Sequence, residues 1–350
     1  MTPMGTTGSG RRAYIGSFTS AGGRGISTAA VDPETGALTP LHATDEVPDP
    51  SYLAVAPDGR RLYAVSETSE GAAAAFTLTE NGPVPLGAPV SVRGAAPTHL
   101  ALWGGHLLTA NYTSGSVSAL RVAADGSLAE PAAVLRHEGG GPNPDRQEGP
   151  HAHAVSPDPS GRWLLSVDLG TDSVRICELD PASGEPVVRH EVRLRAGSGP
   201  RHLAFHPGGG HAYVVNELSS TITPYRWDAA TGTLTPLTET AILPPDAGDN
   251  HPSELVVSPD GRFIWAANRG HDSISVLAVD PSGDGLTLVT TVPCGGHWPR
   301  DLALHPGGRH LYAANERSGD VTWFALDPTT GVPEAGGSIA APAASCVVFA

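Results

Sequence analysis

Short apolar runs recur along the chain, and each opens with a proline and leads into a tight turn. Six such openings are Pro50-Ser-Tyr-Leu-Ala-Val, Pro97-Thr-His-Leu-Ala-Leu, Pro150-His-Ala-His-Ala-Val, Pro200-Arg-His-Leu-Ala-Phe, Pro252-Ser-Glu-Leu-Val-Val and Pro299-Arg-Asp-Leu-Ala-Leu. Their prolines lie 47, 53, 50, 52 and 47 residues apart. A second apolar run follows each turn, and then a third run in which apolar and polar residues alternate, as in Ser273-Ile-Ser-Val-Leu-Ala-Val. This pattern predicts short β-strands joined by Pro/Gly turns.

A fourth short strand, such as Leu38-Thr-Pro-Leu, completes each unit, and four antiparallel strands per unit are typical of a β-propeller blade. The chain starts with a segment like a second strand, Ala13-Tyr-Ile-Gly-Ser-Phe, and ends with one like a first strand, Pro342-Ala-Ala-Ser-Cys-Val-Val-Phe. The sequence therefore predicts an all-β fold. The predicted fold is a single seven-bladed β-propeller of four-stranded antiparallel blades over residues 13–350. Its last blade is closed jointly by the N- and C-terminal strands. Residues 1–12, rich in Gly, Thr and Ser, are predicted to be a disordered extension.

Composition narrows the possible partners. The net charge of −15 at pH 7 argues against nucleic acid and against an anionic membrane surface. Three widely spaced cysteines without a CxxC pair indicate neither a disulfide framework nor a zinc site. No apolar stretch is long enough for a membrane span, so we expect a soluble, cytoplasmic protein. The sequence leaves the oligomeric state open.

The predicted blades bring two sets of residues to one rim of the central channel, because first strands start and second strands end on the same face. The loops of that face vary between repeats, which marks it as the binding face. After the repeat prolines stand Ser51, Thr98, His151, Arg201, Ser253, Arg300 and Ala343, and the second strands end at Glu67, Tyr112, Asp168, Glu217, Arg269 and Glu316. The longest insertion, residues 138–149, adds Arg146 and Gln147. One rim of an acidic protein thus collects arginines.

Several of these residues have a purely structural interpretation. Asn216 and Asn268 are turn formers first, and we expect their side chains to bond nearby backbone. Glu67 and Glu316 are expected to be solvated rim charges, and His99 and His202 to be structural. His151 and His153 share one strand face and could hold a metal, but no second pair of ligands has similar spacing, so neither metal nor cofactor is predicted.

Seven ordered segments resemble the seven-bladed lactonase family, which includes propeller-type 6-phosphogluconolactonases and fungal carboxymuconate cyclases. They are Arg146-Gln, Pro150-His-Ala-His, Val167-Asp-Leu-Gly-Thr-Asp, Gly199-Pro-Arg-His-Leu-Ala-Phe-His-Pro, Asn216-Glu-Leu-Ser-Ser-Thr, Ser258-Pro-Asp-Gly-Arg-Phe and Asn268-Arg-Gly-His-Asp-Ser-Ile. The resemblance implies a catalytic set of His153, Arg201, Glu217 and Arg269. Arg146, Gln147, His151, Asn216, Asn268 and Arg300 are the expected substrate-binding residues.

Lactone hydrolysis needs an activated water and stabilisation of the charge that develops on the carbonyl oxygen. Glu217 or His153 could be the general base, while Arg201 and Arg269 stabilise the oxyanion and Arg300 or Arg146 binds a phosphate or carboxylate. The sequence thus predicts a small anionic lactone as the partner. Its best single interpretation is hydrolysis of 6-phosphogluconolactone to 6-phosphogluconate, a pentose-phosphate step. Two alternatives stay open: a carboxymuconate-type cycloisomerase or lactonase for another carboxylated metabolite, and a propeller that binds without catalysis.

Overall fold

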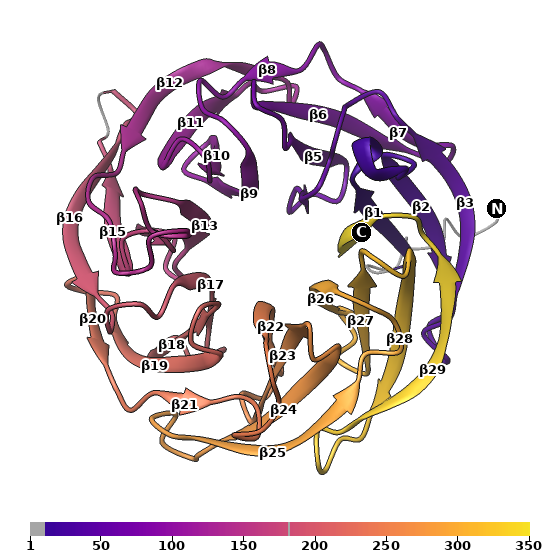
Figure 1. The fold of residues 1–350 in the computed structure, drawn as a ribbon. Helices are drawn as coiled ribbons and strands as arrows, with labels where there is room; N and C mark the ends of the chain where they lie inside the picture. Colours follow the sequence, from indigo (N-terminus) through magenta and orange to yellow (C-terminus); the bar gives the residue numbers. More distant parts are fainter. Residues whose placement is uncertain (1–10, 181–182) are drawn as a thin grey trace.

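A computed structural model describes residues 11–180 and 183–350, and these form seven antiparallel sheets in a ring (Figure 1). Each sheet is one blade, and we number the blades in the chain order of their innermost strands. β9, β13, β17, β22 and β26 lie nearest the centre in Figure 1, and the later strands of each blade lie progressively outward. Within the described part of the chain, no helix has the length and hydropathy needed to cross a membrane.

The bounds of the strands follow the repeat. Blade 1 has β4 (Leu53–Val55), β5 (Arg61–Ser66), β6 (Ala72–Thr79), β7 (Gly82–Pro85) and β8 (Val90–Ser91); blade 2 has β9 (Pro97–Trp103), β10 (His106–Asn111), β11 (Ser116–Val122) and β12 (Leu128–Arg136). Blade 3 has β13 (Ala152–Pro157), β14 (Trp163–Asp168), β15 (Ser173–Leu179) and β16 (Pro186–Arg193). Blade 4 has β17 (Pro200–Phe205), β18 (His211–Asn216), β19 (Thr221–Asp228), β20 (Thr233–Pro236) and β21 (Thr240–Ala241). Blade 5 has β22 (His251–Val257), β23 (Phe263–Arg269), β24 (Ser273–Val279) and β25 (Leu286–Pro293); blade 6 has β26 (Pro299–Leu304), β27 (His310–Asn315), β28 (Asp320–Leu326) and β29 (Pro333–Ala340).

Blade 7 joins the two ends of the chain, and this confirms the predicted closure. Its strands run in the order β30 (Ala344–Phe349), β1 (Arg12–Ser17), β2 (Ile26–Val31) and β3 (Leu38–Thr44), with a short 3₁₀ turn η1 (Thr19–Ala21) after β1. Ala13 pairs with Phe349 and Gly16 with Cys346. Strand β1 begins at Arg12, one residue inside the extension predicted for residues 1–12, because Arg12 pairs with Ala30. Residues 1–10 of that extension lie outside the described residues.

The core lies between the blades, since both faces of each sheet pack against its neighbours. Trp163 of blade 3 and Trp227 of blade 4 are both buried, with ring centroids 6.5 Å apart in an edge-to-face arrangement. This packing is the favourable geometry for two aromatic rings. It also explains why the first and second strands carry nearly unbroken apolar runs.

The inner strands of several blades begin with a β-bulge, and these bulges lie at the mouth of the central channel. In blade 4, Pro200 pairs with Asn216 and His202 with Val215, so Arg201 is an extra residue in a β-bulge. Equivalent register shifts leave Thr98, His153, Arg300 and Ser345 unpaired in their blades. β-bulges re-aim side chains and are frequent beside functional sites.

The strand register also changes which residues of two blades are equivalent to those of the others. The residue that pairs like Pro200 is Ala152 in blade 3 and Ala344 in blade 7, two residues after the prolines used for the sequence alignment. His153 and Ser345, rather than His151 and Ala343, therefore occupy the position of Arg201. The alignment based on proline was wrong in these two blades because their prolines lie in the loop before the strand and do not indicate which residues pair.

Candidate functional site

Two successive layers of side chains project from the inner strands. The mouth ring holds the bulge residue of six blades, together with Ser51 at the matching place before β4 of blade 1; the six are Thr98, His153, Arg201, Ser253, Arg300 and Ser345. The second ring holds the next residue of each blade: Tyr52, His99, Ala154, His202, Glu254, Asp301 and Cys346. Members of the mouth ring tie neighbouring blades together through backbone carbonyls. Ser253 Oγ donates to Pro299 O at 2.6 Å, and Ser345 Oγ donates to Ser51 O at 2.6 Å.

Glu217 is the centre of the charged site at this mouth. It follows β18, and its carboxylate contacts three guanidinium groups from different parts of the chain. Arg146 Nη2 donates to Oε1 at 2.7 Å, Arg269 Nη2 lies 2.7 Å from Oε2, and Arg201 Nε lies 3.2 Å from Oε2. Arg201 is held in place by a 2.5 Å bond from Nη1 to the carbonyl of Ser253. The Glu217 cluster (Arg146, Arg201, Glu217, Arg269) therefore carries more positive than negative charge.

The charges of this cluster are buried. The side chains of Arg201 and Glu217 are each 4% exposed, and that of Arg269 is 8% exposed, whereas Arg146 is 34% exposed. Burial alone would raise the pKa of Glu217, but Arg269, Arg201 and Arg146 overcome it and hold this pKa well below its usual range. Burial, and then Arg269, lower the pKa of Arg201 to about 9, so it is still charged at neutral pH. Glu217 is thus a firmly ionised carboxylate and a weak base in this arrangement.

His153 lies beside the cluster and is uncharged. Burial, and then the positive charge of Arg201, hold the pKa of His153 well below its ordinary value. Its Nδ1 atom is buried and has no hydrogen-bond partner among the described residues. The ring packs edge-on against Tyr112, with centroids 5.6 Å apart. A neutral imidazole with an open nitrogen can accept a proton, which is what a general base requires.

Arg300 belongs to a different charge cluster. Its guanidinium lies 3.3 Å from Glu316 and 3.6 Å from Glu67 and stacks over the ring of Phe18. Glu67 is largely buried and accepts a 2.5 Å hydrogen bond from Ser51, so the expectation that Glu67 and Glu316 are solvated rim charges is wrong. Burial raises the pKa of Glu67, partly offset by Arg300. The charge of Arg300 is therefore already balanced.

Other residues expected to bind substrate already form contacts within the protein. Gln147 donates from Nε2 to Leu169 O at 2.9 Å and accepts from Asn143 N at 3.1 Å, which fixes the β12–β13 loop and presents Arg146. His151 stacks on Tyr112, with ring centroids 4.4 Å apart, and contacts Glu148 through Nε2 at 3.1 Å.

Asn216 and Asn268 each donate from Nδ2 to two third-strand hydroxyls, at positions five and seven residues further on. The sequence-based expectation of bonds to nearby backbone holds for Asn268, whose Nδ2 also donates to Ala266 O at 3.5 Å, whereas the bonds from Asn216 Nδ2 go to side chains. Asn111 repeats the same pair of bonds in blade 2.

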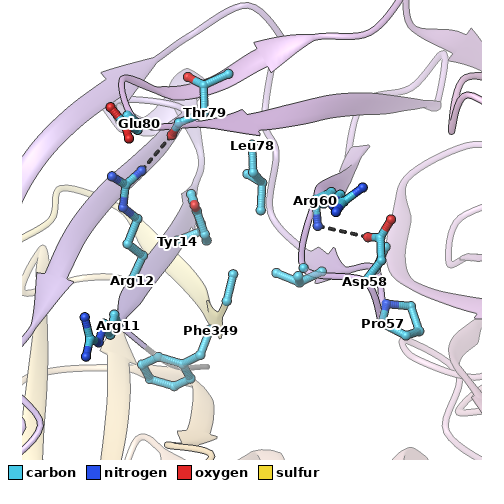
Figure 2. A pocket seen from close by; sticks show the side chains of 14 residues that line it. Arg11, Arg12, Tyr14, Pro57, Asp58, Arg60, Leu78, Thr79, Glu80 and Phe349 are labelled. Carbon is cyan, nitrogen blue, oxygen red and sulfur yellow. Dashed lines mark hydrogen bonds between the residues drawn. The ribbon is translucent and has the colours of Figure 1, made fainter. Parts of the chain in front are cut away.

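A large cavity lies away from this site. It measures about 1000 Å³ and is lined by the starts of β1, the end of β30 and the Pro57-Asp58-Gly59 turn. Figure 2 shows Arg12 donating to Thr79 on one side of it and the backbone of Arg60 donating to Asp58 within the turn on the other side. These residues stand at the opposite ends of the strands from the mouth ring. The buried charged side chains gather instead at the mouth ring, so the chemistry points to the Glu217 cluster.

The second ring contains acidic residues that sequence reasoning missed. Glu254 and Asp301 are buried directly beneath the mouth ring, and His202 is bonded to Glu254. The available signal was an acid one residue after the bulge position, where other blades carry Tyr, His, Ala or Cys. Among the described residues, no group of three or more His, Cys, Asp or Glu side chains is placed to hold a metal ion.

The ring of seven four-stranded blades and the arginine-rich channel mouth define a β-propeller with an anion-attracting central site. The chain matches the family model described as lactonase, 7-bladed beta-propeller, over residues 12–349. It therefore belongs to the seven-bladed β-propeller lactonase family, as the sequence motifs indicated.

Named relatives agree with this assignment. The chain is 33% identical to a 6-phosphogluconolactonase of Bacillus subtilis, over 80% of each sequence. Its structure superposes on a Pseudomonas aeruginosa periplasmic gluconolactonase with a TM-score of 0.91, at 31% identity over 97% of this chain and 98% of the other. A protein from Bacteroides fragilis gives a TM-score of 0.92 at 30% identity, covering 100% of both chains. Together with the family match, these relatives support a lactone hydrolase.

Proposed function

We propose that this protein hydrolyses a small anionic lactone at the channel mouth, and that 6-phosphogluconolactone is its substrate. The observation that carries the proposal is the Glu217 cluster, in which three guanidinium groups face one carboxylate within an otherwise acidic protein. Surplus positive charge in a partly desolvated site favours a phosphate or carboxylate, and guanidinium groups bind both with fixed geometry. The 6-phosphogluconolactonase of Bacillus subtilis is a relative consistent with this substrate.

Each residue of the site has a separate role in the proposed reaction. Arg146, the most exposed of the three arginines, receives the anionic group of the substrate. Arg201 and Arg269 stabilise the negative charge that grows on the carbonyl oxygen when water attacks. His153, neutral and with an open nitrogen, takes the proton of that water. Glu217 holds the three arginines in place, and because both of its carboxylate oxygens contact guanidinium groups, the role of base falls to His153.

A phosphate-free sugar lactone is the second candidate. Arg300 is neutralised by Glu67 and Glu316, so only the Glu217 cluster offers unbalanced charge among the described rim residues. The Pseudomonas aeruginosa relative is a gluconolactonase, and its substrate class carries no phosphate in name. A cytoplasmic location fits the phosphorylated substrate and stays a prediction, since that relative is periplasmic.

The deciding experiment compares three lactones with one purified protein. Freshly prepared 6-phosphogluconolactone, gluconolactone and a carboxylated muconolactone are assayed in parallel, and spontaneous hydrolysis is subtracted for each. We expect kcat/KM for the phosphorylated lactone to exceed that for gluconolactone by about tenfold or more, because one charge-assisted contact contributes about 1.5–3 kcal/mol. A preference for gluconolactone would favour the second candidate. Absence of hydrolysis above background for all three would refute the proposal.

A further inference from the structure

The second ring places several polar side chains beneath His153. The ring centroids of His153 and His202 lie 5.2 Å apart, and those of His202 and His99 lie 5.1 Å apart. His202 Nδ1 contacts Glu254 Oε2 at 2.5 Å. All of these side chains are buried. Charged or polar groups at such depth are costly to bury unless they are bonded, so a layer of them calls for an explanation.

Two imidazole nitrogens at this level have no hydrogen-bond partner. Nδ1 of His153 and Nε2 of His202 are both buried, and neither has a hydrogen-bond partner among the described residues. The two imidazoles lie next to each other, on the adjacent inner strands β13 and β17. Buried polar atoms are paired in most folded proteins, and unpaired ones often mark a catalytic role or a bound water. His202 also has the arrangement of an oriented base, with one nitrogen fixed by a carboxylate and the other free.

We propose that His202 and Glu254 form a proton-holding pair beneath His153 and are further functional residues of the hydrolytic site. The proposal rests on the lactone hydrolysis proposed above. His153 remains the group that meets the attacking water. His202 acts behind it, and Glu254 positions His202.

The proton can be followed through the reaction. The oxygen of water forms a bond to the lactone carbonyl carbon, and the O–H bond of that water breaks as its proton passes to His153. The proton on Nδ1 of His153 then passes to Nε2 of His202, directly or through a water between the two imidazoles, while the proton from the attacking water stays on Nε2 of His153. As it arrives, the proton on Nδ1 of His202 passes to the Glu254 carboxylate, whose Oε2 lies 2.5 Å away, so the His202 ring stays neutral. When the ring C–O bond breaks, the proton returns by the same path to the leaving alkoxide oxygen.

The surroundings of His202 keep its ring neutral and place the exchangeable proton of the pair on Glu254. The titratable and charged groups around it are Tyr52, His99, His153, Arg201, Glu217, Glu254, Arg269, Arg300, Asp301 and Cys346. Burial, and then Arg201, hold the pKa of His202 well below its ordinary value. Burial raises the pKa of Glu254 to about 7, and burial together with Glu254 raises that of Asp301 to about 8.

Asp301 makes the layer accessible to solvent from the other side. It accepts a 2.8 Å bond from Val347 N, which fixes its carboxyl beside Cys346. Glu254 and Asp301 both line a cavity of about 350 Å³ that extends to Pro306 and Phe349, at the far ends of β26 and β30. The pair can therefore regain or lose protons without opening the substrate side of the channel.

The test uses the full-length protein and three variants: Glu254→Gln, His202→Asn and the control His99→Asn. His99 lies in the same ring and contacts His202, but its Nδ1 accepts only a long bond from Val155 N, at 3.4 Å. The pH dependence of kcat/KM on the lactone that the wild type hydrolyses is measured from pH 5 to 9, with melting temperatures at each pH. In parallel, the tautomer and charge of the His202 ring are followed by ¹⁵N NMR.

We expect wild-type activity to rise with pH through about 7, because the carboxylate form of Glu254 is the one that supports His202. Glu254→Gln should lower kcat by about 10–100-fold, as expected for a residue that orients a reacting group, and should remove this ionisation from the profile. His202→Asn should lower kcat at least as much. His99→Asn should keep the wild-type profile.

Each outcome separates the alternatives. Variants of Glu254 and His202 that lose activity only in step with their melting temperature, with an unchanged pH profile, would overturn the proposal. A wild type that hydrolyses no lactone would refute the proposed function instead. The NMR titration would then still decide whether Glu254 controls the protonation of His202, since an unchanged ring signal in Glu254→Gln would reject the pair.

Discussion

Arg146 and Glu217 meet across the channel mouth, with Nη2 2.7 Å from Oε1, although 71 residues separate them in sequence. Arg146 comes from the β12–β13 loop and Glu217 from the end of β18. Arg146 also donates to the Tyr112 hydroxyl at 3.3 Å. The contact places a partly exposed cation on a carboxylate that is already held by two buried arginines, so Arg146 is the member of the cluster that a ligand can reach.

Replacement of Arg146 should therefore affect binding more than folding. We expect Arg146→Gln to raise KM for an anionic lactone about tenfold, equal to about 1.4 kcal/mol, and to weaken competitive inhibition by sulfate. Steady-state kinetics at several salt concentrations measure both effects. The control is Arg93→Gln, because Arg93 pairs with Glu130 on the exposed surface. An unchanged KM in Arg146→Gln would exclude this residue from anion binding.

Removal of the Glu217 carboxylate should change activity, stability and anion affinity together. Glu217→Gln leaves three guanidinium groups without their counter-charge, and breaking a buried ion pair costs about 3–5 kcal/mol. We expect a lower melting temperature, tighter sulfate binding and kcat/KM reduced by about 10²-fold or more. Added sulfate should restore part of the melting temperature, because it binds only the folded state. Weaker sulfate binding would contradict the charge balance inferred for this cluster.

His153 should behave differently, because it is uncharged. His153→Asn removes the ring nitrogens but no charge, and Nδ1 of His153 has no partner to lose. We expect kcat to fall about 10²-fold or more while sulfate affinity stays within about twofold and the melting temperature within a few degrees. Kinetics, calorimetry and thermal melts check the three parts. Near-normal turnover in this variant would remove His153 from the reaction.

Buried Asp301 should make the protein less stable as the pH rises. Its pKa is raised to about 8 in the fold, so its contribution is fully present below the ordinary aspartate value and is lost as the pH rises to about 8. The loss amounts to at most about 1.4 kcal/mol per pH unit. Asp301→Asn keeps an acceptor for Val347 N and should flatten the decline in urea-derived stability between pH 5 and 8. His153 and His202 contribute the same slope to both proteins, so identical slopes would contradict burial of an ionisable Asp301.

The joint blade gives a prediction about stability. Deletion of residues 341–350 removes β30, and with it the inner strand that pairs with β1 and the bond from Ser345 to Ser51. We expect aggregation or a fall of many degrees in melting temperature, because the inner edge of β1 becomes exposed. Thermal melts followed by circular dichroism check this result. A truncated protein that melts within a few degrees of the full chain would show that blade 7 does not close the ring.

The repeat in the amino-acid sequence was enough to specify the architecture and to place the proposed site residues at one rim. The recurring apolar runs and turns specify seven blades, and the unmatched ends specify the joint blade, because strand period and turn chemistry are local properties. The same repeat placed Arg201, Glu217 and Arg269 at one rim. It placed His153 there as well, although the proline-based alignment put His151 at the equivalent position.

Only the tertiary structure decided how these residues are paired. The three-arginine contact of Glu217, the neutralisation of Arg300 and the bond between His202 and Glu254 join segments that are far apart in the chain. Ionisation of each group depends on burial and on the distance to neighbouring charges, and neither quantity is encoded in local sequence. The β-bulges have the same origin, since an extra residue is defined only against the strand it faces.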